Sequence, residues 1–500
     1  MKLKITVVSL FFILLVSLSR VTAGGRPQSV SDDYYTPDDY YAPDDYYPWK
    51  KYPYDHWRIE RYAAMAKPAA GYGNYSGSGT PKTAGAYLDR GIIFAMRGDY
   101  DMAIEDFSEA INLNPEYHTA WMLRGRARFA SISNVIAVGE KFSGFSLMLR
   151  NPQTLSDGEK FEYDEIITDY TLAIKFGPNN TNAYLGRGNV YLSKGDYDRA
   201  IADFNLAIKL SPNSADAYNN RGNAYYSKRN NDRAIADYNR AIKLDPNFAP
   251  AYFNRGLAYY SKGDNKFAIA DYNRAIRLAP DFAPAYNNRG LAYRHRGNND
   301  RAIADYNRAI KLDPDFTPAY FNRGLAYYNE GDNKFAIADY NQAIRLDPNF
   351  ALAYYNRGLA YRQKGDNDRA MADYDQAIRL DPDFAPAYAG RSFVYLNKGE
   401  YDLAIEDCNR AIKLNLNDAR AYVGRGFVYL NKGDKDRAIE DYNRAIKLDP
   451  NYASAYYKRA WIYENRGEYA RAIADYNQAI ELNPNNESAK ELLGMLNFMR

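Results

Sequence analysis

The chain has 500 residues, among them 50 tyrosines, three histidines and one cysteine, and its 65 basic and 62 acidic residues leave a formal charge of +3. The interleaved charges give no strong field for nucleic acid, and a single cysteine excludes an intramolecular disulfide. His56, His118 and His295 lie far apart in the sequence, which argues against a metal or haem site built by the protein. We therefore expect no metal and no cofactor.

The first 23 residues have the pattern of a secretory signal. A basic start (MKLK) precedes an apolar run over 5–18, and Val21-Thr22-Ala23 supplies small residues for cleavage after Ala23. Fourteen apolar residues are fewer than the roughly 20 that span a bilayer. The pattern predicts a secreted or periplasmic protein without a membrane span after the signal is removed.

Residues 24–83 are expected to form a disordered tail and linker. The DDYYxP pattern of 32–49 contains DDYY three times, twice as DDYYxP and a third time as DDYYPW, and its prolines oppose helix formation. A Gly/Ser-rich spacer follows over 68–81, without the strand or the GK[ST] sequence of a phosphate-binding loop.

A period of 34 residues begins near Ala84 and yields eleven repeats. Each repeat has one arginine at the same place, and we use it as the marker of the repeat. The marker arginines are Arg90, Arg124, Arg187, Arg221, Arg255, Arg289, Arg323, Arg357, Arg391, Arg425 and Arg459. The second repeat is longer because of an insertion at about 132–160, expected between its two helices. A repeat period of 20–50 residues is typical of solenoids.

The residue pattern of each repeat predicts two helices joined by a turn. Counting the marker arginine as position 7, aromatic and small residues occupy positions 4, 8 and 11 and then 20, 24 and 27, which are helical stripes. Gly263-Asp264 exemplifies the turn, and Pro250 exemplifies a proline at the helix start. Position 8 is glycine in nine repeats, which costs about 1 kcal/mol in a helix and so predicts a closely packed partner helix.

These positions resemble the tetratricopeptide repeat family over residues 84–486. The resemblance implies an all-α fold, a right-handed superhelical solenoid of antiparallel helix pairs in which the first helix of each pair lines the concave side. Residues 487–500 are expected to form a capping helix, whose apolar end suggests self-association.

Position 7 is arginine and position 23 is aspartate in all eleven repeats, as in Arg255 with Asp271 and Arg289 with Asp305. Both positions lie eight residues from the turn, so an antiparallel hairpin places them at the same height. We predict a partly buried ion pair in every repeat, which sets register more than net stability.

Position 6 holds asparagine in five consecutive repeats: Asn220, Asn254, Asn288, Asn322 and Asn356. The pattern resembles the asparagine ladder in the repeats of O-linked N-acetylglucosamine transferases, where this position faces the groove. An amide donates and accepts, which suits the backbone of a bound peptide. The alternative is that these amides bridge adjacent helices.

Aromatic and cationic residues accompany the asparagines. Position 5 includes Phe253 and Phe321, and position 12 includes Tyr260, Arg294, Tyr328 and Arg362. Repeats 3, 9 and 10 have Gly186, Gly390 and Gly424 at position 6. Those glycines open either a second, apolar site or space for core packing.

Cys408 replaces the aromatic residue of position 24 and is expected to be a buried apolar side chain. The chain carries none of the common catalytic motifs. We therefore expect an exported, non-catalytic scaffold that binds extended polypeptide, with protein or peptide partners. The alternative is a self-assembling structural protein, a homo-oligomer that uses its DDYYxP tail and its apolar C-terminal end.

Overall fold

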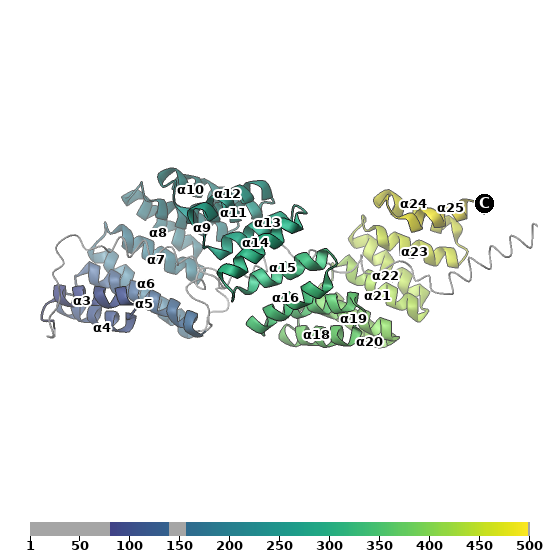
Figure 1. Ribbon diagram of the computed structural model, residues 1–500, viewed down its shortest axis with the longest axis horizontal. Coiled ribbons are helices and arrows are strands. Elements are labelled where there is room, and N and C mark those ends of the chain that lie inside the picture. The colour runs from purple at the N-terminus through teal and green to yellow at the C-terminus, as the bar shows by residue number, and fades with distance from the viewer. Residues whose placement is uncertain (1–80, 140–156, 499–500) are drawn as a thin grey trace, which may run out of the picture. The chain divides into compact units, whose positions relative to one another are not determined.

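The computed structural model describes residues 81–139 and 157–498. The predicted signal, nearly all of the tail, and the middle of the insertion lie outside these residues. The described residues form 23 helices and no strand, arranged as successive antiparallel pairs (Figure 1). They divide into two compact parts, 81–326 and 327–498, which we call the N-terminal and C-terminal parts.

The helices of the N-terminal part are α3 (Ala84–Arg97), α4 (Tyr100–Leu113), α5 (His118–Gly139), α6 (Asp157–Phe176), α7 (Thr181–Lys194), α8 (Tyr197–Leu210), α9 (Ala215–Ser227), α10 (Asn231–Leu244), α11 (Ala249–Ser261), α12 (Asn265–Leu278), α13 (Ala283–Arg294) and α14 (Asn299–Leu312). The division between the parts falls within α15 (Thr317–Asn329). The C-terminal part continues with α16 (Asn333–Leu346), α17 (Ala351–Gln363), α18 (Asn367–Leu380), α19 (Ala385–Lys398), α20 (Tyr401–Leu414), α21 (Ala419–Lys432), α22 (Lys435–Leu448), α23 (Ala453–Asn465), α24 (Tyr469–Leu482) and α25 (Glu487–Phe498). Odd-numbered helices up to α23 are the first helices of the repeats, and even-numbered ones are the second.

In every repeat except the second, whose connection lies outside the described residues, the turn between the two helices contains one left-handed residue. In the fifth repeat Gly263 has φ +81°, and its N–H donates to the carbonyl of Tyr260 at 2.9 Å. Glycine adopts this conformation without steric cost. In the fourth repeat Arg229 takes the same place with φ 60°, so this turn carries backbone strain.

The close packing between the two helices of a repeat explains why position 8 is glycine. A Cβ added to Gly256 would lie 2.6 Å from Cε1 of Tyr272, a side chain with no solvent exposure. The ring of the second helix therefore rests directly on the backbone of the first helix. In the ninth repeat a larger residue, Ser392, faces a smaller one, Cys408, and both are buried.

The insertion differs from expectation at both of its ends. Helix α5 continues to Gly139 and α6 begins at Asp157, so the predicted insertion of 132–160 contributes helix to each.

The C-terminal helix α25 caps the last repeat as predicted. Leu492, Leu493 and Leu496 pack against the cluster formed by α23 and α24 around Tyr476. Met495, on the other hand, is 48% exposed. Most of the described apolar residues that had suggested self-association therefore cover the end of the array.

Candidate functional site

The first helices of neighbouring repeats form one continuous layer within each part. Helix α9 contacts both α7 and α11, α11 contacts α13, and in the C-terminal part α19 contacts both α17 and α21. Over the described residues, second helices of neighbouring repeats approach one another less closely. In a curved stack the more tightly spaced layer is the inner one. We call the surface of the first helices the inner face.

The arginine–aspartate pair predicted for every repeat is confirmed in ten of the eleven repeats. Arg255 donates from Nη2 and Nε to the two carboxylate oxygens of Asp271 at 2.6 and 2.8 Å, and Arg289 pairs with Asp305 at the same distances. Equivalent pairs join Arg90–Asp106, Arg124–Asp169, Arg187–Asp203, Arg221–Asp237, Arg357–Asp373, Arg391–Asp407, Arg425–Asp441 and Arg459–Asp475. Two parallel charge-assisted bonds fix the height of one helix against the other.

The same arginines also join neighbouring repeats, which the sequence pattern had not revealed. Nη1 of Arg289 donates to Oδ1 of Asn273 in the preceding repeat at 2.6 Å. Burial alone would lower the pKa of Arg289, but its hydrogen bonds and its attraction to Asp305 outweigh burial and raise it. These arginines are therefore held in the architecture rather than offered to a partner.

The five position-6 asparagines do not line an open surface. Asn220, Asn254, Asn288, Asn322 and Asn356 are only 1–2% exposed. The expectation that these side chains face an open groove is corrected, because position 6 lies in the seam between adjacent first helices. Binding of a peptide backbone by these side chains requires amide atoms that are not already hydrogen-bonded within the protein.

Several of these amides bridge helices, the alternative considered from the sequence. Asn254 on α11 donates from Nδ2 to Oδ1 of both Asn219 and Asn223 on α9, at 2.9 Å each. Asn322 likewise donates to Asn287 at 2.9 Å. The Oδ1 atoms of Asn254 and Asn288, however, are buried without a hydrogen-bond partner in the described structure.

Position 5 belongs to the core, contrary to its assignment as a peptide contact. Phe253 is 4% exposed and Phe321 is 0% exposed. The ring of Phe253 lies 5.0 Å from that of Phe282, edge to face, and 5.7 Å from that of Tyr272. Aromatic pairs in these arrangements stabilise the packing of one repeat on the next.

Position 12 supplies the predicted residues that retain exposed surface. In the N-terminal part Tyr260 is half-buried, its ring 5.3 Å from that of the exposed His295, whereas Arg294 is buried. In the C-terminal part Tyr328 and Arg362 are half-buried, and Gln363 Nε2 donates to the Tyr328 hydroxyl at 2.8 Å. His295 and Gln363, both at position 13, were missed by sequence reasoning.

The last three repeats have an inner face of different character. Position 9 is leucine in repeats 5–8 but Phe393, Phe427 and Trp461 in repeats 9–11. The guanidinium of Arg362 lies 5.0 Å above the ring of Phe393, and Lys458 Nζ lies 5.2 Å above that of Phe427. Gly390 leaves room for the ring of Tyr374, 2.8 Å from an added Cβ, so packing explains this glycine.

The described residues contain one cysteine and no cluster of side chains that could hold a metal ion. Cys408 is 2% exposed, as predicted, and burial raises the pKa of its thiol to about 12. No group of three His, Cys, Asp or Glu side chains within 81–139 and 157–498 could hold a metal ion. No helix in those ranges is long and apolar enough to cross a membrane.

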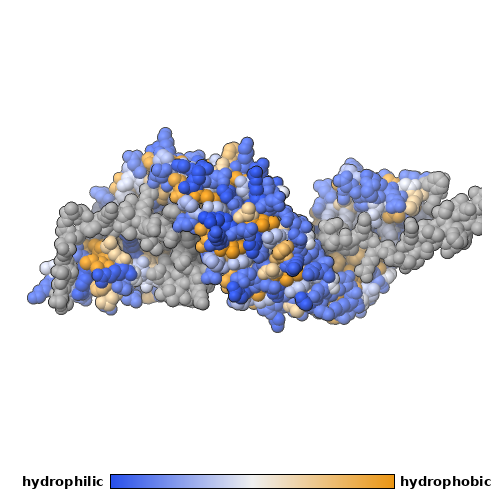
Figure 2. Space-filling view, viewed as in Figure 1, coloured by the Kyte–Doolittle hydropathy of each residue, from blue (hydrophilic) through white to orange (hydrophobic). Residues whose placement is uncertain are grey.

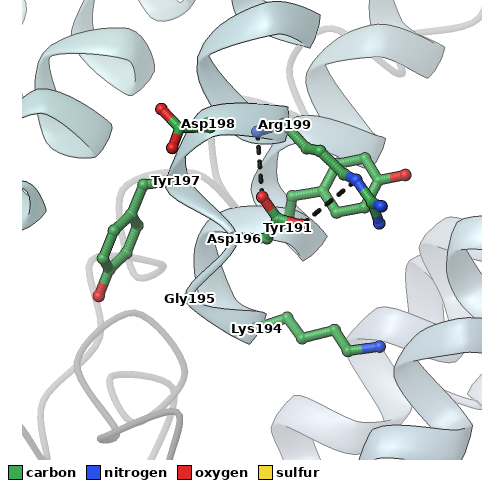
Figure 3. A pocket seen from close by; sticks show the side chains of 7 residues that line it. All are labelled: Tyr191, Lys194, Gly195, Asp196, Tyr197, Asp198 and Arg199. Atoms are coloured by element: carbon green, nitrogen blue, oxygen red, sulfur yellow. Dashed lines mark hydrogen bonds and ion pairs between the residues drawn. The ribbon is translucent and has the colours of Figure 1, made fainter.

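A surface hollow of about 420 Å³ lies at the turn between α7 and α8 (Figure 3). Its lining includes Tyr191, Lys194 and Arg199, and Asp196 accepts a bond from the backbone N–H of Arg199. Lys194 pairs with Asp164 of the preceding repeat at 2.5 Å. The hollow is thus bordered by a helix-capping contact and a contact between repeats.

Polar residues cover most of the described surface in the view of Figure 2.

The helix pairs, turns and stacking define a helical-repeat solenoid. A TPR repeat model matches residues 188–229, 222–263, 256–295, 290–331 and 324–365. Tetratricopeptide repeat models match 84–117, 351–384, 373–406, 390–453, 428–487 and 457–499. The chain belongs to the tetratricopeptide repeat family. A comparison with curated proteins finds no match.

Solved structures with similarity to this chain are also of this class. A tetratricopeptide repeat protein from Parabacteroides merdae is 25% identical over 50% of this chain and 98% of its own, with a TM-score of 0.44. YrrB, described as a TPR protein with an unusual peptide-binding site, is 29% identical over 37% of this chain and 95% of its own, with a TM-score of 0.32. MamA is 32% identical over 32% of this chain and 96% of its own, with a TM-score of 0.29.

Proposed function

We propose that the protein is an exported, non-catalytic scaffold that binds extended segments of partner proteins along its inner face. Stacked repeats characteristically present extended concave binding surfaces. The observation that carries the proposal is that, within each part, first helices form a continuous layer, which bears half-buried Tyr260 in the N-terminal part and half-buried Tyr328 and Arg362 in the C-terminal part. Rigid aromatic rings and arginine are the side chains that dominate binding energy at protein interfaces.

The spacing of the layer suits a polypeptide backbone. Packed helices lie about 8–10 Å apart, and three extended residues rise about 10 Å. Each repeat therefore meets the bound chain at about every third residue. The partnerless acceptors of Asn254 and Asn288 recur at this spacing, and an unsatisfied buried polar group costs about 1–3 kcal/mol. A peptide N–H reaching these atoms, as neighbouring side chains move aside, would recover that cost.

Export rests on the signal pattern of residues 1–23. We propose a secreted or periplasmic location on that pattern. N-terminal sequencing of the mature protein should begin at Gly24, and a mature chain that still begins at Met1 contradicts export.

The binding proposal is tested by selecting a random peptide library on the immobilised full chain. Enriched peptides should bind Tyr260→Ala or Arg362→Ala variants at least about tenfold more weakly, the loss of roughly 1.4 kcal/mol that one anchor supplies. A matched control is Phe335→Ala, an exposed ring on a second helix. Failure to enrich any peptide, or equal affinity for all variants with unchanged melting, contradicts the proposal.

A further inference from the structure

Arg362 is a half-buried arginine of the inner face that has no acidic partner in the ranges the structure describes. Its guanidinium lies 5.0 Å above the ring of Phe393. The marker arginines before and after it, Arg357 and Arg391, are each bound by an aspartate. A cation that has already lost part of its water, and has no counter-ion, is stabilised by an incoming anion more than a fully hydrated cation is.

The hydroxyl groups around Arg362 are neutral and have protons to donate. Gln363 Nε2 donates to the hydroxyl oxygen of Tyr328 at 2.8 Å, which leaves the hydroxyl proton of Tyr328 for another acceptor. The hydroxyl of the buried Tyr374, on the second helix of the same repeat, has no hydrogen-bond partner among the described residues. Burial raises the pKa of Tyr328 and of Tyr374, although the positive charge of Arg362 lowers both, so neither supplies a negative charge. These surroundings favour a carboxylate.

Arg362 belongs to a row of half-buried side chains at position 12, one from each first helix of the C-terminal part. In chain order the row consists of Tyr328, Arg362, Leu396, Leu430 and Glu464. Adjacent packed helices lie about 8–10 Å apart, and three extended residues rise about 10 Å. An extended segment that follows the row therefore meets one of these side chains at about every third residue.

The row changes character along its length. Two apolar side chains follow the cation of Arg362, and the row ends on Glu464, which accepts the hydroxyl proton of Tyr476 at 2.6 Å. A like charge placed against Glu464 opposes binding, so an acidic residue of a partner is favoured at one end of the row and disfavoured at the other. In the N-terminal part the arginine at this position, Arg294, is buried, so it does not offer the same contact.

We propose that this row selects partner segments with one internal Asp or Glu, whose carboxylate binds Arg362 and the Tyr328 hydroxyl. Apolar residues three and six positions to one side of that acid lie against Leu396 and Leu430. The planar guanidinium can donate two parallel bonds to a carboxylate while one of its faces stays on a ring. First helices lie on both sides of Arg362, so the bound acid is inside the segment rather than at its end. The inference rests on the proposed function and names the class of partner sequence for one part of the chain.

The test selects a random library of C-terminally amidated peptides on the immobilised full chain. A class of enriched peptides should share an Asp or Glu with apolar residues at the third and sixth positions from it. These peptides should bind Arg362→Glu at least about tenfold more weakly, and a lysine in place of their acid should restore binding to that variant. The matched control is Arg369→Glu on the second helix of the same repeat, 67% exposed, which should bind like the natural chain. Arg362→Met, which keeps the Phe393 ring covered, replaces Arg362→Glu if charge reversal lowers the melting temperature, and it should show the same loss.

The spacing is tested by two further selections. Leu396→Glu should change the preference at the third position from apolar to basic, and Leu430→Glu should do so at the sixth. The inference is overturned if no enriched peptide depends on Arg362, if the preferences change at other positions, or if binding requires a free C-terminal carboxylate in a parallel library that carries one. If enriched peptides still bind the inner tyrosines in those cases, only this inference fails and the proposed function stands. If neither library yields a binder, both fail.

Discussion

Replacing Gly256 with alanine tests how closely the two helices of a repeat pack. The new Cβ would lie 2.6, 2.9 and 3.2 Å from Cε1, Cδ1 and Cζ of Tyr272, whose ring is fully buried. Overpacking of a tight core costs about 1–3 kcal/mol, and alanine recovers about 1 kcal/mol of helix propensity. We therefore expect a net loss in unfolding free energy of up to about 2 kcal/mol.

Urea unfolding of the full chain measures this loss, and hydrogen exchange of α11 and α12 locates it. The control is Gly494→Ala in α25, where nothing lies within 4 Å of an added Cβ, so propensity alone should stabilise that helix. Repeat 11 tolerates Ala460 at the equivalent position, but there the tyrosine hydroxyl is held by Glu464, an acidic partner that repeat 5 lacks. If Gly256→Ala is as stable as the natural chain, the close-packing argument is wrong.

The remaining predictions concern single contacts. Arg255→Ala should cost about 3 kcal/mol in urea unfolding because Asp271 is left buried without its partner, whereas joint replacement by methionine and leucine should cost much less; equal losses contradict this. Asn254→Ala removes two bonds between α11 and α9 and should cost about 1–3 kcal/mol, with faster amide exchange in both helices; unchanged exchange refutes the bridging role. Arg229→Gly should raise stability by about 1 kcal/mol through relief of its positive φ, and a loss would show that the strain argument fails. Cys408 has a folded pKa of about 12, above its ordinary 9.0, so its contribution to stability is present below pH 9.0 and lost as pH rises towards 12; Ellman's reagent should label it at about pH 8 only after unfolding, and labelling of the native chain at the rate of a free thiol contradicts its burial.

The period of 34 residues was enough to predict the helices, their turns and the pairing of Arg255 with Asp271. Each of these depends on short-range geometry that recurs in every repeat. The close packing of the partner helix at Gly256 could also be predicted from the sequence. A glycine inside a helix has few explanations other than close packing.

The exposure of the candidate site could not be read from the same pattern. Position 6 lies at the margin of the first helix, and its burial depends on how tightly α9 and α11 approach. Asn254 is therefore buried, although its helical phase alone would place it near the surface. The bond from Arg289 to Asn273 was missed for a related reason, because it depends on contacts between repeats rather than within one.

The central claim is that extended polypeptide binds along the first helices. Hydroxyl-radical footprinting with a library-selected peptide compares the exposure of side chains on both layers in one experiment. The account predicts slower oxidation of Tyr260 or Tyr328 on the inner face, and unchanged oxidation of Phe267 and Phe335 on the second helices. Protection of Phe267 and Phe335 with no change at the inner tyrosines would contradict it.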